Sequence, residues 1–374
     1  MNDRNEKIRN LLVPIFSVIL GLVLGAILMA AFGYNPGQGY SSMLNASLGS
    51  QRSIGETLRQ ATPLIFTALG FSVANSAGFF NIGLSGQALC GWIVSVWVAL
   101  AFPDLPKVIL LPTCVILGAL AGALAAAIPG VLRAFFGTSE VIVTIMMNYI
   151  LLYLSTFALH DIMPDTYRSS LDSSNLIGQN ASLRLPWLTQ MFGGSRVNAG
   201  LFLALIALVV VMKKTTLGFE IRSVGLNPFA SEYAGMSSKR TIVFSMMISG
   251  ALAGLGGVVE GLGTYQNFFV QTTSLAIGFD GMAVSLLGSG SAIGILLSAL
   301  LFSILKIGGL GMQTGAGIPF EIVNVSIALI IFFVGINFLI RFIMAKFFQG
   351  KKQEAIVETV ESKPTNQSQE GGEL

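Results

Sequence analysis

The sequence predicts an all-α polytopic membrane protein with about ten transmembrane helices, one of them short or broken. Three observations support this fold class. First, 53% of the 374 residues are hydrophobic and only 10% are charged, whereas soluble domains carry about 25% charge. Second, apolar runs of about 20 residues, the length that crosses about 30 Å of hydrocarbon, recur along the chain. Third, the 43 glycines favour close helix packing in lipid.

The apolar runs define nine full spans and one short element. The spans are predicted near residues 11–32, 61–80, 84–102, 107–129, 140–160, 198–213, 242–262, 292–308 and 318–340. The first run is too long for the hydrophobic region of a signal peptide and has no cleavage site after it, so we expect a retained span. Segment 280–288 has about half the required length and predicts a half-helix or re-entrant element. Cys90 and Cys114 fall inside apolar runs, where packing is expected rather than a disulfide.

Basic residues set the expected orientation, because Lys and Arg concentrate in cytoplasmic loops. With the N-terminus inside, about fourteen basic residues fall on the cytoplasmic side and roughly six outside. Nine passes would place the basic tail after Arg341 outside, whereas counting 280–288 as a tenth pass returns it to the cytoplasm. We therefore expect a cytoplasmic N-terminus (1–10), a transmembrane domain (11–340) and a cytoplasmic, disordered tail (341–374).

The longest predicted cytoplasmic loop, residues 213–241, contains a short capped helix. Asn227 is a suitable N-cap, Pro228 a suitable first residue and Gly235 a suitable end. Phe229 and Tyr233 are four residues apart and therefore share one face. An exposed helix with paired aromatic residues is suited to the groove of another protein. The alternative is a loop helix that folds back against the membrane surface.

Four motifs occur in order along the chain and together carry a family resemblance. They are "FFNIGLSGQ" (79–87), "GTSEVIVTIMMNYI" (137–150), "GFEIRSVGLNPFASEYAG" (218–235) and "GFDGMAVSLLGSG" (278–290). Over about residues 11–340 the chain resembles the permease subunits of bacterial ABC importers for ribose-type sugars, branched-chain amino acids and nucleosides. The first two motifs and the long outer loop 161–197 look most like the nucleoside-uptake branch.

The resemblance implies a type II ABC importer-like fold and a set of partners. These are a cytoplasmic ABC ATPase, a second permease subunit of different sequence, and an extracellular substrate-binding lipoprotein. It implies nucleoside import across the bacterial cytoplasmic membrane, with a ribose-type sugar permease as the alternative. The segment Asn227 to Gly235, with Arg222 and Gly225 before it, would correspond to the coupling helix that engages the ATPase.

The sequence lacks the G-x-x-x-x-G-K-[ST] loop that cradles nucleotide phosphates. ATP and Mg²⁺ are therefore expected at the partner ATPase, and no cofactor is expected on this chain. Any energy from ATP must reach the permease through a protein contact such as the loop helix.

Polar residues within predicted spans are candidates for the substrate pathway. Asn81, Ser85 and Gln87 mark one helix break, and Asp280 with segment 288–291 marks another. Broken helices at membrane depth face protein or a water-filled cavity and often border a transport path. The candidate pathway residues are Asn81, Ser85, Gln87, Asn148, Tyr149, Glu260, Asp280 and Asn324. The alternative for each lone Asn or Ser is an interhelical hydrogen bond without ligand contact.

Two other classes of function would require different residues. Gly83-Leu84-Ser85-Gly86 has the G-x-S-G pattern of intramembrane serine proteases, but a serine nucleophile needs a base within about 3 Å. The only histidine, His160, is predicted at the outer end of its span, far from Ser85. An ion-coupled secondary transporter would need ionisable groups in mid-span, and the predicted spans contain few. We therefore expect a transport subunit and not an enzyme.

Overall fold

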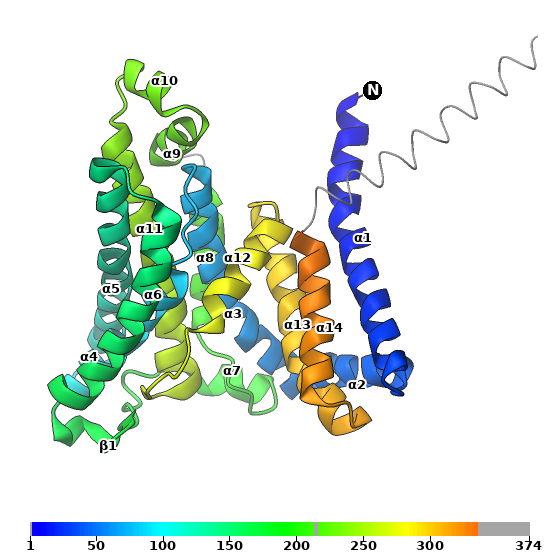
Figure 1. The fold of residues 1–374 in the computed structure, drawn as a ribbon. Helices are drawn as coiled ribbons and strands as arrows, with labels where there is room; N and C mark the ends of the chain where they lie inside the picture. Colours follow the sequence, from blue (N-terminus) through cyan, green and yellow to red (C-terminus); the bar gives the residue numbers. More distant parts are fainter. Residues whose placement is uncertain (1, 213–215, 336–374) are drawn as a thin grey trace, which may run out of the picture.

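The computed structural model describes residues 2–212 and 216–335. The predicted C-terminal tail and the end of the last predicted span lie outside this part. Ten helices run along the bundle in the described residues (Figure 1). They are α1 (Asn2–Ala31), α3 (Gln51–Ser76), α4 (Leu84–Ala101), α5 (Lys107–Phe136), α6 (Glu140–Phe157), α8 (Gly200–Met212), α11 (Ser238–Val258), α12 (Ala276–Leu287), α13 (Ala292–Ala316) and α14 (Phe320–Gly335).

The bundle has two ends that differ in structure. At one end, called the α10 end, lie the start of α1 and helices α9 (Thr216–Leu226) and α10 (Pro228–Tyr233), and α14 runs toward this end (Figure 1). Because the chain returns to the end at which it starts, the number of passes is even. The predicted tenth element is confirmed as α12, a helix of 12 residues, too short to span alone. This is the architecture of a multi-pass membrane protein.

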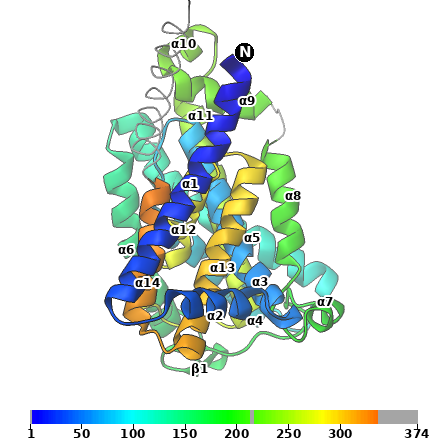
Figure 2. The same cartoon turned by 90° about the vertical axis from the view of Figure 1, so that its right-hand side faces the viewer.

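The opposite end, called the β1 end, carries the longer connections. Helix α2 (Pro36–Leu48) lies across it between α1 and α3 (Figure 2). The loop after α6 continues as a π-helix, η1 (Ala158–Ile162), and a 3-10 turn, η2 (Asp165–Tyr167). A small hairpin of β1 (Arg168–Ser170) and β2 (Ser173–Ser174) and helix α7 (Pro186–Met191) follow. A second π-helix, η3 (Val259–Tyr265), extends α11 at this end.

Five helices of the described part are long and apolar enough to cross a membrane, and α3 is not among them. The predicted span 61–80 lies in α3, which begins ten residues earlier than predicted and ends at Ser76. Its first turns are polar, with Ser50 as N-cap and an Arg59–Glu56 ion pair of 2.6 Å. A span is predicted from a run of apolar residues. The first ten residues of α3 include polar and charged side chains, so the predicted span begins only at residue 61.

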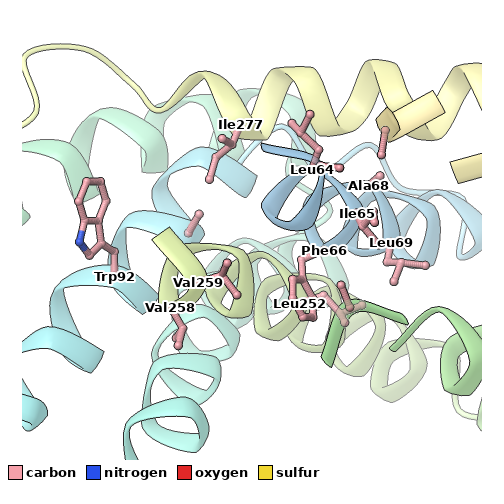
Figure 3. Close-up of a cluster of buried hydrophobic side chains, with 14 of the residues drawn as sticks. Leu64, Ile65, Phe66, Ala68, Leu69, Trp92, Leu252, Val258, Val259 and Ile277 are labelled. Atoms are coloured by element: carbon pink, nitrogen blue, oxygen red, sulfur yellow. The ribbon is translucent and has the colours of Figure 1, made fainter. Parts of the chain in front are cut away.

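The core is centred on α3 (Figure 3). Leu64, Ile65 and Phe66 are fully buried and lie between α12 on one side and α11 on the other. Burial of one such side chain, compared with its exposure to water, contributes about 1.5–3 kcal/mol to stability. Helix α3 therefore lies at the centre of the bundle, packed against α11, α12 and α13.

Glycines bring α4, α5 and α11 into backbone contact. A Cβ atom on Gly257 of α11 would collide with the carbonyl oxygen of Ala88 in α4. A Cβ atom on Gly122 of α5 would likewise collide with the carbonyl oxygen of Gly250 in α11. Small residues permit such close approach in lipid, which confirms the role predicted for the glycine content. Cys90 and Cys114 are free, as predicted.

Candidate functional site

The connection between α3 and α4, residues 77–83, holds the first group of predicted pathway residues. Asn81 is fully buried and its Nδ2 donates to Gln87 Oε1 at 3.0 Å and to Ser249 Oγ at 2.8 Å. Its Oδ1 accepts the N–H of Gly83 at 2.9 Å. Helix α4 has no side-chain cap at Gly83, so Asn81 supplies the hydrogen bond that orders the chain just before the helix.

Asn148 of α6 closes the same break from the other side. Its Oδ1 accepts the N–H of Gly86 at 2.8 Å, and its Nδ2 donates to the carbonyl of Ile82 at 2.9 Å. Thr144 Oγ1 accepts the N–H of Ile82 at 3.3 Å. The structure thus brings Asn81, Gln87 and Asn148 together, with their amides paired to protein. In this conformation they make the interhelical hydrogen bonds that were the alternative to ligand contact.

Ser85 also has a protein partner, since its Oγ donates to the carbonyl of Leu275 at 2.7 Å. His160 lies 3.2 Å from Asp172 in the loop after α6. Gly86 is level with Asn148, and His160 follows Asn148 by 12 residues, which is about 18 Å at the rise of an α-helix. Ser85 and His160 therefore each have their own hydrogen-bond partner in different parts of the bundle.

The second break joins α12 to α13, and an ion pair links the two helices about two turns or more away from it. Ser289 adopts a φ of +50°, and the chain turns within four residues before Ser291 caps α13. Asp280 of α12 pairs with Lys306 of α13. Lys306 lies inside an apolar run, and the rule that intramembrane charges are functional candidates would have identified it.

The ion pair predicts how stability differs between the wild-type chain and two variants. Asp280→Asn is expected to lower the stability of the solubilised protein by about 3 kcal/mol, because it leaves the ammonium group of Lys306 without its partner. The double variant Asp280→Asn/Lys306→Met is expected to recover most of this loss, since no unpaired charge remains. The thermal unfolding midpoint of the three proteins in one detergent measures both effects. A double variant no more stable than Asp280→Asn would show that the pair does not act as a unit.

The remaining predicted pathway residues are not brought together. Glu260 lies in η3 near the β1 end and is 6% exposed. Tyr149 is 55% exposed on the outer face of α6 although its neighbour Asn148 points inward. Asn324 is exposed on α14. Tyr149 and Asn324 therefore lie apart from the buried polar group at the first break.

The α10 end carries the predicted coupling segment. Asn227 Oδ1 accepts the N–H of Ala230 at 3.1 Å, Pro228 begins the helix, and Gly235 follows its end with a φ of +84°. The predicted caps are confirmed, and the helix ends at Tyr233, two residues before Gly235. Phe229 and Tyr233 are 76% and 96% exposed. Helix α10 thus presents two aromatic rings away from the bundle.

Helix α9 links this surface to the first break. Gly225 of α9 lies against the end of α3, where an added Cβ would collide with the carbonyl oxygen of Ser76. Gly78 in turn faces the backbone of Gly225. Arg222 of the same helix is exposed. The last turn of α9 is therefore in direct backbone contact with the connection that contains Asn81.

Two further polar residues of the first break were not predicted. Ser249 accepts from Asn81, and Thr144 accepts from the backbone of Ile82. Neither stands out in sequence, because single serines and threonines are common in membrane helices. The described residues contain no group of three or more His, Cys, Asp or Glu side chains that could hold a metal ion.

Comparison with known proteins identifies the family. A model described as "branched-chain amino acid transport system / permease component" matches residues 53–335. The chain is 54% identical to the nucleoside ABC transporter permease protein NupB of Lactococcus lactis, over 94% of this chain and 98% of the relative. It is 45% identical to the guanosine ABC transporter permease protein NupP of Bacillus subtilis, over 91% and 97%.

A third relative has a different named substrate. The chain is 34% identical to the glucose ABC transporter permease protein TsgB13 of Haloferax volcanii, over 86% of each chain. No solved structure matches the chain. The matched model spans most of the helical bundle, from α3 to the last described residue of α14. The chain therefore belongs to the ABC transporter permease family described as the permease component of branched-chain amino acid transport systems.

Proposed function

We propose that this chain is the membrane-embedded permease subunit of an ATP-driven importer that carries nucleosides across the bacterial cytoplasmic membrane. The observation that carries the proposal is its identity of 54% and 45%, over more than nine-tenths of its length, to permeases named for nucleoside and guanosine transport. The glucose permease at 34% identity keeps a sugar substrate as the second candidate.

The proposed partners follow from the ABC family and from the surfaces at the two ends. A cytoplasmic ABC ATPase binds α10 through Phe229 and Tyr233. An extracellular substrate-binding lipoprotein docks at the β1 end, and a second permease of different sequence completes the pathway. The N-terminus (1–10), the coupling loop (213–241) and the C-terminal tail (341–374) lie in the cytoplasm, and residues 11–340 form the permease domain.

The chain itself is proposed to be a transport subunit without catalytic activity. ATP and Mg²⁺ bind to the partner ATPase, and this chain binds no cofactor. Support comes from the missing phosphate-binding loop in the sequence and from the hydrogen bond that Ser85 donates to a backbone carbonyl. The buried polar group at the first break borders the path that nucleosides take once the bundle opens.

An uptake assay tests the substrate directly. Cells that lack this gene, and the same cells with the gene restored, are given labelled guanosine, ribose and leucine in turn. Restoration is expected to increase guanosine uptake and to leave leucine uptake unchanged. Restored ribose uptake without guanosine uptake would contradict the nucleoside proposal and favour the sugar permease. As a control for a missing subunit, the proposed ATPase, second permease and binding lipoprotein are expressed together with this chain.

A further inference from the structure

Helices α5 and α11 lie side by side at the α10 end of the bundle. Both are long and apolar enough to cross a membrane. A Cβ atom on Gly130, in the second half of α5, would lie 3.0 Å from the Cβ atom of Met246 in α11. Closer to the end, the Lys239 ammonium group of α11 lies over the ring of Phe135 in α5, 5.5 Å from the ring centroid. The last turn of α5 and the first turn of α11 therefore form one continuous surface.

The length of α5 places this surface at the depth of the lipid headgroups. The helix has 30 residues, which at 1.5 Å per residue extend over about 45 Å. A bilayer with both headgroup regions is about 40–45 Å thick. No charged residue lies between Lys107 at the start of α5 and Arg133 in its last turn. Helix α10 extends beyond the neighbouring ends of α5 and α6 (Figure 1), so it lies farther from the hydrocarbon than this surface does.

Two cations on this surface have no carboxylate partner. Lys239 and Arg240 are both exposed, and among the residues that the structure describes no ion pair joins either of them to an acidic side chain. Arg133 of α5 differs from them, because it pairs with Glu140 at 3.3 Å. Cations at the membrane surface attract the headgroups of anionic lipids. Lys239 and Arg240 are therefore free to bind an anion at this depth.

Exposed aromatic rings accompany these cations. Phe135 and Phe136 at the end of α5 are 60% and 74% exposed. Phe244 is 51% exposed and follows Arg240 by four residues, so the two side chains share one face of α11. A small anion dissolved in water would use only the cations. A phospholipid offers its phosphate to the cations and its acyl chains to the rings, so it matches both features of the surface.

We propose that the surface formed by Lys239, Arg240, Phe135 and Phe136 binds an anionic phospholipid. The ammonium and guanidinium groups donate charge-assisted hydrogen bonds to the phosphate oxygens. A headgroup with net negative charge, such as that of phosphatidylglycerol, is favoured over phosphatidylcholine, whose own ammonium group cancels the phosphate charge. The inference requires that the chain spans a membrane and does not depend on which substrate is transported.

A lipid titration of the purified full-length chain tests this proposal. The chain is delipidated in a neutral detergent and titrated with phosphatidylglycerol or phosphatidylcholine, and native mass spectrometry measures the bound lipid. Lys239→Gln/Arg240→Gln is expected to weaken phosphatidylglycerol binding about thirtyfold, because each cation near an anionic surface contributes about fivefold. Phosphatidylcholine binding is expected to stay unchanged. The matched control, Arg52→Gln/Arg196→Gln, removes two exposed cations at the β1 end and is expected to retain phosphatidylglycerol binding.

The outcomes separate a lipid site from a general effect of charge and from a protein contact. Equal weakening in the two double variants would show that net charge alone attracts the lipid and would overturn the site. Lys239→Arg/Arg240→Lys keeps both charges and is expected to retain binding. Unchanged phosphatidylglycerol binding in Lys239→Gln/Arg240→Gln would overturn the proposal, and loss of ATPase co-purification in that variant would then assign the surface to the ATPase. The unfolding midpoint of each variant without added lipid checks that the fold is retained.

Discussion

Replacing Phe229 and Tyr233 together by alanine is expected to abolish ATP-driven uptake while the chain still inserts and folds. Both rings are almost fully exposed on α10, so their loss removes little packing within the bundle. Aromatic anchors at an interface contribute about 2 kcal/mol or more each, and loss of two would weaken ATPase binding roughly a thousandfold. Co-purification of the ATPase with the tagged permease measures binding, and uptake in the same cells measures coupling.

A matched control lies at the other end of the bundle. Phe102 follows α4 near the β1 end and is also exposed, but it is far from α10. Phe102→Ala is expected to leave ATPase binding unchanged. Wild-type uptake in the Phe229→Ala/Tyr233→Ala variant would rule out α10 as the coupling element.

Gly257→Val is expected to prevent assembly of the bundle. The added Cβ would collide with the backbone carbonyl of Ala88, and backbone cannot turn aside as a flexible side chain can. Overpacking of this kind destabilises by about 3 kcal/mol, and separation of α4 from α11 would also disturb the glycine contacts with α5. The amount of permease in the membrane and its unfolding midpoint in detergent measure the effect.

Gly178→Val is the corresponding control, because no atom lies within 4 Å of a Cβ at that position. It adds the same side chain to the outer loop and is expected to leave expression and midpoint unchanged. If Gly257→Val is as abundant and stable as Gly178→Val, the backbone contact between α4 and α11 is not essential for assembly.

Most of the helical architecture could be predicted from apolar run length, including the short α12. The exceptions are the beginning of α3 and helix α2. The beginning of α3 contains Arg59 and Glu56, which pair with each other at the edge of the bundle, and hydropathy cannot recognise charges that are neutralised locally. Helix α2 was not predicted because it lies across the bundle end and is too short and polar to resemble a span.

The coupling segment was predicted almost residue by residue because its signals are local. Asn227, Pro228 and Gly235 act on their own neighbours in the chain, and their geometry follows from capping and backbone preference alone. The buried polar group was predicted only as a set of candidates. Asn81 and Asn148 are 67 residues apart, and nothing local in either segment indicates that both serve the start of α4.

Glu260 illustrates the remaining limit of sequence reasoning. Its chemistry identified it as a pathway candidate, but the sequence does not show which charged side chains lie near it or which partners those side chains have. Arg59 and Lys306 belong to other helices, and their pairing with Glu56 and Asp280 appears only in three dimensions.

The contact between Gly225, Gly78 and the carbonyl of Ser76 has a mechanical consequence. Gly225 of α9 meets the carbonyl oxygen of Ser76, and Gly78 meets the backbone of Gly225, so no side chain separates α9 from the connection that contains Asn81. We expect a displacement of α9 to reach that connection directly, because no flexible side chain lies between the two backbones. A bulkier residue at position 225 would push the last turn of α9 away from Ser76 and Gly78.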